Sequence, residues 1–256
     1  MGERTRHAPG AFSWVDLATS DADGAKVFYG ALLGWRFEDM PVPDSPPYSM
    51  ATIDGRTVAA VYGKRDDAQP SAWLSYVTVD NADSSAARAT ELGATVISEP
   101  FDVLEAGRMA VLQDPTGAVF AVWQPKQSIG AQLVNDAGAL TMNQLNTSDP
   151  GTAQSFYSGL FGWTFQQVAS GEQAYWGINN GERLNGGMMP TPQGWEIPSH
   201  WLAYFTTADL DASVAQVREL GGGVTIGPVP IPAGRFAVAT DPQGAGFALF
   251  EGEVDD

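Results

Sequence analysis

The chain has 256 residues, 44% hydrophobic and 17% charged, a composition that favours packed domains over disorder. Its formal net charge of −17 argues against binding to nucleic acid or to an anionic membrane, because both need a basic surface. The absence of cysteine excludes disulfides, thiolate nucleophiles and cysteine metal sites.

The first ten residues are polar and lack the apolar core of a signal peptide. No apolar run approaches the roughly 18 residues that a membrane-spanning helix requires. We therefore expect a soluble, cytoplasmic protein.

The first predicted elements are a strand and a helix. Residues 12–19 alternate between apolar and polar, which predicts a strand, and Ser20-Asp21 is a turn or helix-cap signal. Residues 22–34 carry apolar side chains at helical spacing and end at Gly34, a typical C-terminal cap. Three strand-like runs follow, at residues 35–42, 47–53 and 57–63.

The same order then recurs. Residues 72–80 predict a strand, and residues 82–93 predict a helix closed by Gly93. Three further strands are predicted at residues 94–101, 107–114 and 118–124. The segment DPTG at residues 114–117 is a tight turn, since Pro fixes φ and Gly accepts a positive φ. Strand, helix and three strands thus occur twice.

The whole pattern is duplicated further along the chain. VFYGALLGW at residues 27–35 matches SFYSGLFGW at residues 155–163, an offset of 128 residues. GRMAVLQDPTGAVFAVW from Gly107 matches GRFAVATDPQGAGFALF from Gly234, an offset of 127 residues. A period this long indicates a domain duplication. We predict an α+β fold with modules at residues 10–125 and 138–252, joined by a linker at residues 124–139.

The combination of FY and LGW on one helix, VD before a second helix, and DPxG before a final strand resembles the vicinal oxygen chelate superfamily. That superfamily includes glyoxalase I, extradiol dioxygenases, fosfomycin-resistance enzymes and bleomycin-binding proteins, and the resemblance covers nearly all the chain. It implies that the two βαβββ units of each module form a half-open mixed β-barrel with helices outside. We interpret FY, LGW and DPxG themselves as structural motifs without chemistry.

The resemblance also implies where a divalent metal would be held, on four strands of a module. Counting from the shared motifs, these positions fall on Trp14 and Met142, near Ala59-Ala60 and Gly186-Gly187, on Leu74 and Leu202, and on Ala121 and Ala248. Trp, Leu and Ala offer no usable lone pair, and a Met thioether is a soft ligand. We predict no metal and no cofactor. Asp16, Gln144 and His200, which share faces with the expected positions, remain as alternative ligands.

Strand alternation predicts what lines the concave faces in place of metal ligands. The predicted ligand-binding residues are Trp14, Tyr48, Met50, Tyr76 and Trp123 in the first module and Met142, Gln144, Tyr175, Leu202, Tyr204 and Phe250 in the second. Trp195 and Trp201 lie close by in sequence. Such a lining suits an apolar or flat aromatic ligand. The alternative is that these side chains fill the barrel, with Tyr76 and Tyr204 in a core between the modules.

Arg108 and Arg235 are equivalent in the repeat, each directly after a Gly at the start of a strand. We favour a surface or interface salt bridge for both, and the alternative is a grip on a ligand carboxylate or phenolate.

Three functions are compatible with these features. The first is a metal-independent protein that binds a small molecule, sequestering or carrying an antibiotic or metabolite. The second is a metal-independent isomerase, cyclase or lyase of secondary metabolism, with Asp16 or His200 as acid or base. The third is a metal-dependent glyoxalase or dioxygenase. The partner is a small molecule in each case, and the chain is either a monomeric pseudo-dimer or a homodimer.

Overall fold

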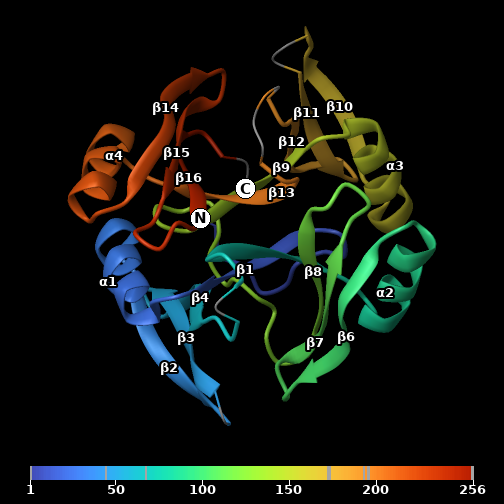
Figure 1. Ribbon diagram of the computed structural model, residues 1–256, viewed down its shortest axis with the longest axis horizontal. Helices are drawn as coiled ribbons and strands as arrows, with labels where there is room; N and C mark the ends of the chain where they lie inside the picture. The colour runs from blue at the N-terminus through green and yellow to red at the C-terminus, as the bar shows by residue number, and fades with distance from the viewer. Residues whose placement is uncertain are drawn as a thin grey trace.

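The computed structural model describes residues 2–43, 45–66, 68–171, 174–192, 194 and 197–254 (Figure 1). In these residues the chain forms two eight-stranded mixed sheets and four α-helices, which confirms the predicted α+β fold of two tandem modules. The first module consists of β1 (Phe12–Thr19), α1 (Ala22–Leu33), β2 (Arg36–Val42), β3 (Ser45–Ile53), β4 (Arg56–Gly63), β5 (Ala72–Thr78), α2 (Ala82–Glu91), β6 (Thr95–Val103), β7 (Gly107–Gln113) and β8 (Val119–Pro125). The second consists of β9 (Leu140–Thr147), α3 (Pro150–Phe161), β10 (Thr164–Ala169), β11 (Tyr175–Asn180), β12 (Arg183–Pro190), β13 (His200–Thr206), α4 (Leu210–Glu219), β14 (Gly223–Ile231), β15 (Gly234–Thr240) and β16 (Gly246–Gly252).

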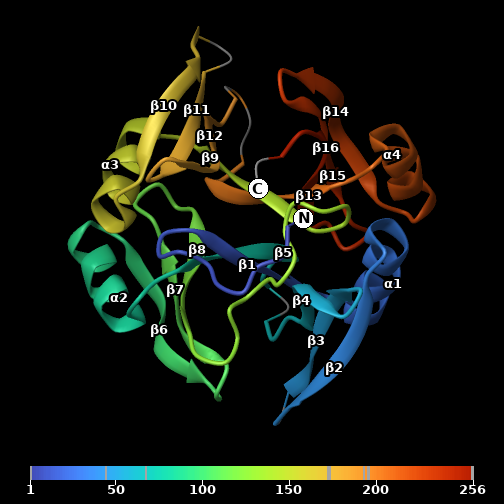
Figure 2. The same cartoon turned by 180° about the vertical axis from the view of Figure 1, so that it is seen from behind.

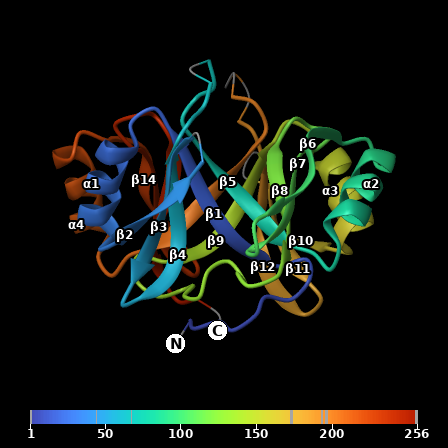
Figure 3. The same cartoon turned by 90° about the horizontal axis from the view of Figure 1, so that it is seen from below.

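Both sheets have the same topology. Their strand orders are β2-β3-β4-β1-β5-β8-β7-β6 and β10-β11-β12-β9-β13-β16-β15-β14. The first strand of each module pairs antiparallel with the fifth, and this central pair joins the two βαβββ units. Each sheet curls into a half-barrel, and the two half-barrels lie back to back with their central strands in contact (Figures 1 and 3).

The helix boundaries follow the sequence signals. Asp21 caps α1 by accepting a hydrogen bond from the Gly24 backbone N–H at 2.9 Å. Gly34 ends the helix with φ of 73°, a conformation that costs glycine little because it has no Cβ. In the second module Asp149 and Gly162 cap α3 in the same way.

The hydrophobic core is shared between the modules. Helix α1 lies beside α4, and α2 lies beside α3 (Figures 1 and 2). One buried cluster combines Tyr29 of the first module with Phe205 and Phe247 of the second. Another combines Phe120 with Trp201. Each βαβββ unit therefore buries its helix against a unit of the other module.

The tryptophans of the repeated LGW motif cross the same interface. Trp35 Nε1–H donates to the Gly138 carbonyl oxygen at 2.8 Å, and Trp163 Nε1–H donates to the Gly10 carbonyl oxygen at 2.8 Å. Each tryptophan thus reaches the glycine just before the first strand of the other module. Trp201, expected near a cleft, also lies in this interface, because its position on β13 points away from the concave face.

The N-terminal segment and the linker run together over the lower side of the molecule in Figure 3. Linker residue Ala131 donates its backbone N–H to the Ser13 carbonyl oxygen at 2.7 Å, on β1. Glu3 and Leu133 form an isolated antiparallel bridge. None of the helices in the described residues is long and apolar enough to cross a membrane.

Candidate functional site

Strand register brings the predicted residues of the first module onto one face. Trp14 pairs with Tyr76, which in turn pairs with Ala121. Trp14, Tyr76 and Trp123 belong to one cluster, against which Tyr48 and Met50 pack. The opposite face of the same sheet packs on the helices, so alternation along β1 separates a core face from a concave face.

Asp16 lies in the middle of this concave face and is held by two tyrosines. Its Oδ2 accepts hydrogen bonds from the Tyr76 hydroxyl at 2.8 Å and the Tyr48 hydroxyl at 2.9 Å. Tyr48 in turn accepts a hydrogen bond from Trp14 Nε1–H at 3.0 Å. The other carboxyl oxygen, Oδ1, is buried without a hydrogen-bond partner among the described residues. Such an oxygen has unused capacity to accept a hydrogen bond.

Burial raises the pKa of Asp16 to about 7, and the hydrogen bonds from Tyr76 and Tyr48 offset part of this rise. Because both tyrosines donate to Oδ2, the proton of the neutral form belongs on Oδ1. Near neutral pH the carboxyl group is therefore divided between a form that accepts a hydrogen bond and a form that donates one.

The innermost side chains of this face are well packed. Trp14, Tyr76 and Trp123 are 7%, 5% and 8% exposed. Tyr48, Met50 and Leu74 are half-buried and form the accessible part of the surface. Leu74 pairs directly with Asp16, so it is the side chain beside the carboxyl group on β5.

The second module replaces the carboxyl group with a neutral network. Tyr204 donates its hydroxyl hydrogen to Gln144 Oε1 at 3.0 Å, and Gln144 Nε2 donates to Asn146 Oδ1 at 3.0 Å. His200 Nδ1 lies 2.9 Å from the Pro198 carbonyl oxygen, which only accepts, so Nδ1 carries the hydrogen. His200 Nε2 then accepts from Asn146 Nδ2 at 3.2 Å.

The remaining predicted residues of the second module also share one face. Leu202, Tyr204 and Phe250 are buried together, and Met142 packs against them. The Tyr175 hydroxyl donates to Met142 Sδ at 3.9 Å. Tyr204 and its counterpart Tyr76 thus face the concave sides, so the interpretation of both as core between the modules is wrong. Trp195 lies outside the described residues.

The two predicted acid–base residues are on separate faces. Asp16 is buried on β1 of the first sheet, whereas His200 begins β13 of the second sheet and is half-buried. They do not form a catalytic pair. Arg108 and Arg235 form surface ion pairs, Arg108 with Asp83 and Arg235 with Glu251, each at 2.7 Å.

The residues at the metal positions do not fit a divalent cation. In the first module Trp14, Ala60, Leu74 and Ala121 surround the centre of the concave face, and none of them has a ligand lone pair. In the second module the corresponding residues are Met142, Gly187, Leu202 and Ala248. Within the described ranges, no three His, Cys, Asp or Glu side chains are grouped to hold an ion.

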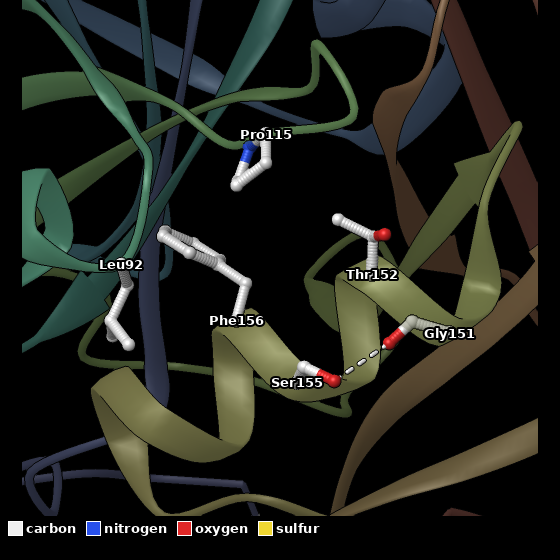
Figure 4. Close-up of a pocket in the computed structure, with 6 residues that line it drawn as sticks. All are labelled: Leu92, Pro115, Gly151, Thr152, Ser155 and Phe156. Atoms are coloured by element: carbon white, nitrogen blue, oxygen red, sulfur yellow. Dashed lines mark hydrogen bonds between the residues drawn. The ribbon is translucent and has the colours of Figure 1, made fainter.

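Two hollows lie away from the concave face of the first module. One of about 300 Å³ is bounded by Leu92, Pro115 and the first turns of α3, where the Ser155 hydroxyl donates to the Gly151 carbonyl oxygen (Figure 4). The other, of about 630 Å³, lies between the N-terminal segment and the second module and reaches Met142.

Several residues of the first concave face were not predicted from the sequence. Met109 pairs with Trp123 and could have been found by extending the alternation to β7. Tyr62 stacks on Tyr48 at a centroid distance of 5.7 Å. Ala131 and Val134 come from the linker, and no periodic signal points to them because they are not in a strand.

Known proteins resemble the chain in both sequence and fold. The model of the "Glyoxalase-like domain" family matches residues 14–123, and that of the "Glyoxalase/Bleomycin resistance protein/Dioxygenase superfamily" matches residues 139–249. The "Putative glyoxylase CFP32" of Mycobacterium tuberculosis is 40% identical, over 98% of both chains. The "Anthracycline biosynthesis protein DnrV" of Streptomyces peucetius is 34% identical, over 96% of this chain and 95% of that one.

Solved structures share the fold at low sequence identity. The 2,3-dioxygenase LapB from Pseudomonas sp. KL28 superposes with a TM-score of 0.68 at 15% identity, covering 98% of this chain and 96% of that chain. The Mn(II)-bound glyoxalase from Novosphingobium aromaticivorans also gives 0.68 at 15%, covering 97% and 84%. These similarities and the duplicated βαβββ units show that the chain belongs to the glyoxalase/bleomycin resistance protein/dioxygenase superfamily, as a tandem two-module member.

Proposed function

We propose that the chain binds a flat, polycyclic aromatic small molecule of secondary metabolism on the concave face of the first module, without a metal ion. The observation that carries this proposal is Asp16, a buried carboxyl group with a free Oδ1 in a wall of tryptophan and tyrosine. The similarity to the Streptomyces peucetius protein named for anthracycline biosynthesis supports an aromatic ligand. We further propose that the protein acts in the cytoplasm, as a monomeric pseudo-dimer or a homodimer.

The half-buried Tyr48, Met50 and Leu74 would contact the flat face of the ligand. Each aromatic contact adds about 0.5–1.5 kcal/mol beyond the burial of area. Asp16 would select the polar group, because its ionised form accepts from a phenolic hydroxyl and its neutral form donates to a quinone carbonyl. Oδ1 is buried, so binding requires a neighbouring side chain such as Leu74 to move.

The test is a titration with an anthracycline aglycone, in which binding is measured by the quenching of tryptophan fluorescence and by calorimetry. Trp14→Ala should raise Kd at least about tenfold, since it removes an aromatic wall and the donor to Tyr48. Phe250→Ala, which removes an aromatic side chain from the second concave face, is the matched control and should leave Kd unchanged. Equal losses in both variants, or no loss in Trp14→Ala, would contradict the proposal.

A second candidate function is a metal-independent isomerase, cyclase or lyase that uses Asp16 as its acid or base. The pKa of about 7 favours it, because a carboxyl group with that pKa takes up and returns a proton near neutral pH. His200 is less suited, since its Nε2 lone pair already accepts from Asn146.

Chromatography of the aglycone after incubation with stoichiometric protein separates the two functions. Turnover by the wild type that is lost in Asp16→Asn, with binding retained, would establish the enzyme. Recovery of unchanged aglycone would support the binding protein. The side chains at the metal positions do not support the metal-dependent alternative.

A further inference from the structure

The larger hollow is built from segments that are distant in sequence. Its volume is about 630 Å³, within the range of small-molecule sites. One wall is the N-terminal segment from Arg4 to Phe12, and the opposite wall is formed by β9 together with the ends of β11 and β12. Neither Asp16 nor Trp14 lines it, so it is distinct from the concave face of the first module.

The charge of this hollow is opposite to that of the protein. The chain has 30 Asp and Glu residues against 13 Lys and Arg, yet Arg4, Arg6 and Arg183 line the hollow with Glu182 as the one acidic residue. Among the described residues, no carboxylate lies within ion-pair distance of these three arginines. Arg4 donates to the backbone oxygen of Glu3 at 3.1 Å. Grouped guanidinium groups without acidic partners favour an anion.

The N-terminal wall is fixed to the second module by hydrogen bonds. Asn180 Nδ2 donates to the Pro9 carbonyl oxygen at 2.9 Å, and Asn185 Nδ2 donates to the Gly10 carbonyl oxygen at 3.0 Å. His7 Nε2 donates to the Ala131 carbonyl oxygen at 2.7 Å, and burial lowers the pKa of His7. His7 is therefore neutral at pH 7, and the arginines supply the positive charge.

The remaining lining mixes polar side chains, several of them asparagines, with apolar ones. The apolar part includes Phe12, Leu140 and Met142, of which Phe12 and Leu140 are buried. We propose that this hollow binds an organic anion, with its carboxylate held by Arg6 and Arg183 and its apolar body packed against Phe12, Leu140 and Met142. A free phosphate would use the arginines but not the apolar surface, which gives a way to distinguish the two ligands.

Calorimetry with 2-naphthoate, its uncharged analogue 2-naphthol, and inorganic phosphate tests this proposal. Naphthoate should bind, and both other probes should bind at least about tenfold more weakly. Arg6→Ala combined with Arg183→Ala should raise the Kd of naphthoate at least about tenfold and reduce its dependence on salt. Arg36→Ala combined with Arg218→Ala, the same charge change at two exposed residues outside the lining, should leave Kd unchanged.

Thermal unfolding should first show that both double variants are folded, which we expect because all four arginines are exposed. Equal Kd values for the two double variants would overturn the proposal, as would phosphate binding as tightly as naphthoate. Absence of naphthoate binding up to millimolar concentration would also overturn it. Naphthoate binding that survives the loss of Arg6 and Arg183 but not Trp14→Ala would place the anion on the first concave face, again against the proposal.

Discussion

The hydroxyl of Tyr29 donates a hydrogen bond to Oδ2 of Asp241, 212 residues further along the chain, at 3.1 Å. The counterpart in the repeat is Tyr157, which donates to Asp114 Oδ2 at 2.9 Å. The FY tyrosine of each module therefore meets the DPxG aspartate of the other. In both aspartates Oδ1 accepts hydrogen bonds from backbone N–H groups of the turn. The same carboxylate therefore stabilises both the turn and the contact between the modules.

Removing one of these tyrosine hydroxyls should destabilise the whole protein. Tyr29→Phe leaves Asp241 Oδ2 buried without its donor, and we expect the free energy of unfolding to fall by about 1–3 kcal/mol. Urea unfolding, followed by tryptophan fluorescence, measures the change. Tyr175→Phe is the matched control, since its hydroxyl meets only a thioether at 3.9 Å, and it should cost less than about 0.5 kcal/mol. A similar cost in both variants would contradict this role.

The shared cores predict that a single module does not fold independently. A chain of residues 1–128 would expose the surface of α1 and α2 that the second module buries. We expect each half alone to be unfolded or aggregated in circular dichroism and size-exclusion chromatography, and mixed halves to recover the native spectrum. A monomeric, cooperatively folded half would show that the cross-module contacts are dispensable. A homodimer of one half would instead indicate that a second copy of the same module can take the place of the other module.

Asp16 should make stability depend on pH in a defined direction. Burial raises its pKa from 3.8 to about 7, so between these values the folded protein holds a proton that the unfolded chain has released. Stability from this group is complete below the unfolded pKa and is lost as pH rises toward the folded pKa. Relative to Asp16→Asn, the wild type should lose about 1.4 kcal/mol per pH unit in that window.

Urea unfolding of the wild type and Asp16→Asn at several pH values measures this difference. The contributions of the other carboxyl groups cancel because both proteins contain them. Gln144→Glu is the converse variant: Asp16→Asn removes a buried carboxyl group, whereas Gln144→Glu introduces one at the equivalent buried position beside Tyr204. It should acquire a slope of the same sign. A flat difference between wild type and Asp16→Asn from pH 5 to pH 7 would show that Asp16 is ionised throughout.

Metal removal should change neither stability nor ligand binding. The side chains at the metal positions of the first module offer no lone pair, so a chelator has nothing to extract there. Elemental analysis after dialysis against Zn(II) or Fe(II) should find less than about one-tenth equivalent of bound metal. A stoichiometric ion that is lost in Asp16→Ala would contradict this prediction and identify Asp16 as a ligand.

Much of the fold is determined by short-range signals. Helices α1 and α3 end at Gly34 and Gly162 in a conformation that glycine adopts easily. The repeated motifs align the sequences of the two modules. Alternation along β1 predicts that Trp14 and Asp16 share a face, because successive side chains of a strand point in opposite directions. Once the family resemblance gives the metal positions, the chemistry of the side chains there shows that they are unsuitable ligands.

Tertiary structure decided the features that depend on distant partners. The sequence indicated that the FY motif, which includes Tyr29, is structural, but only the packing of α1 against the second module shows that the Tyr29 hydroxyl meets Asp241. The pKa of Asp16 follows from its burial, with Tyr76 and Tyr48 brought together from different strands. The arginine-lined hollow exists because the N-terminal segment folds back onto β12. Burial and long-range contact set these properties, and neither can be read from local spacing.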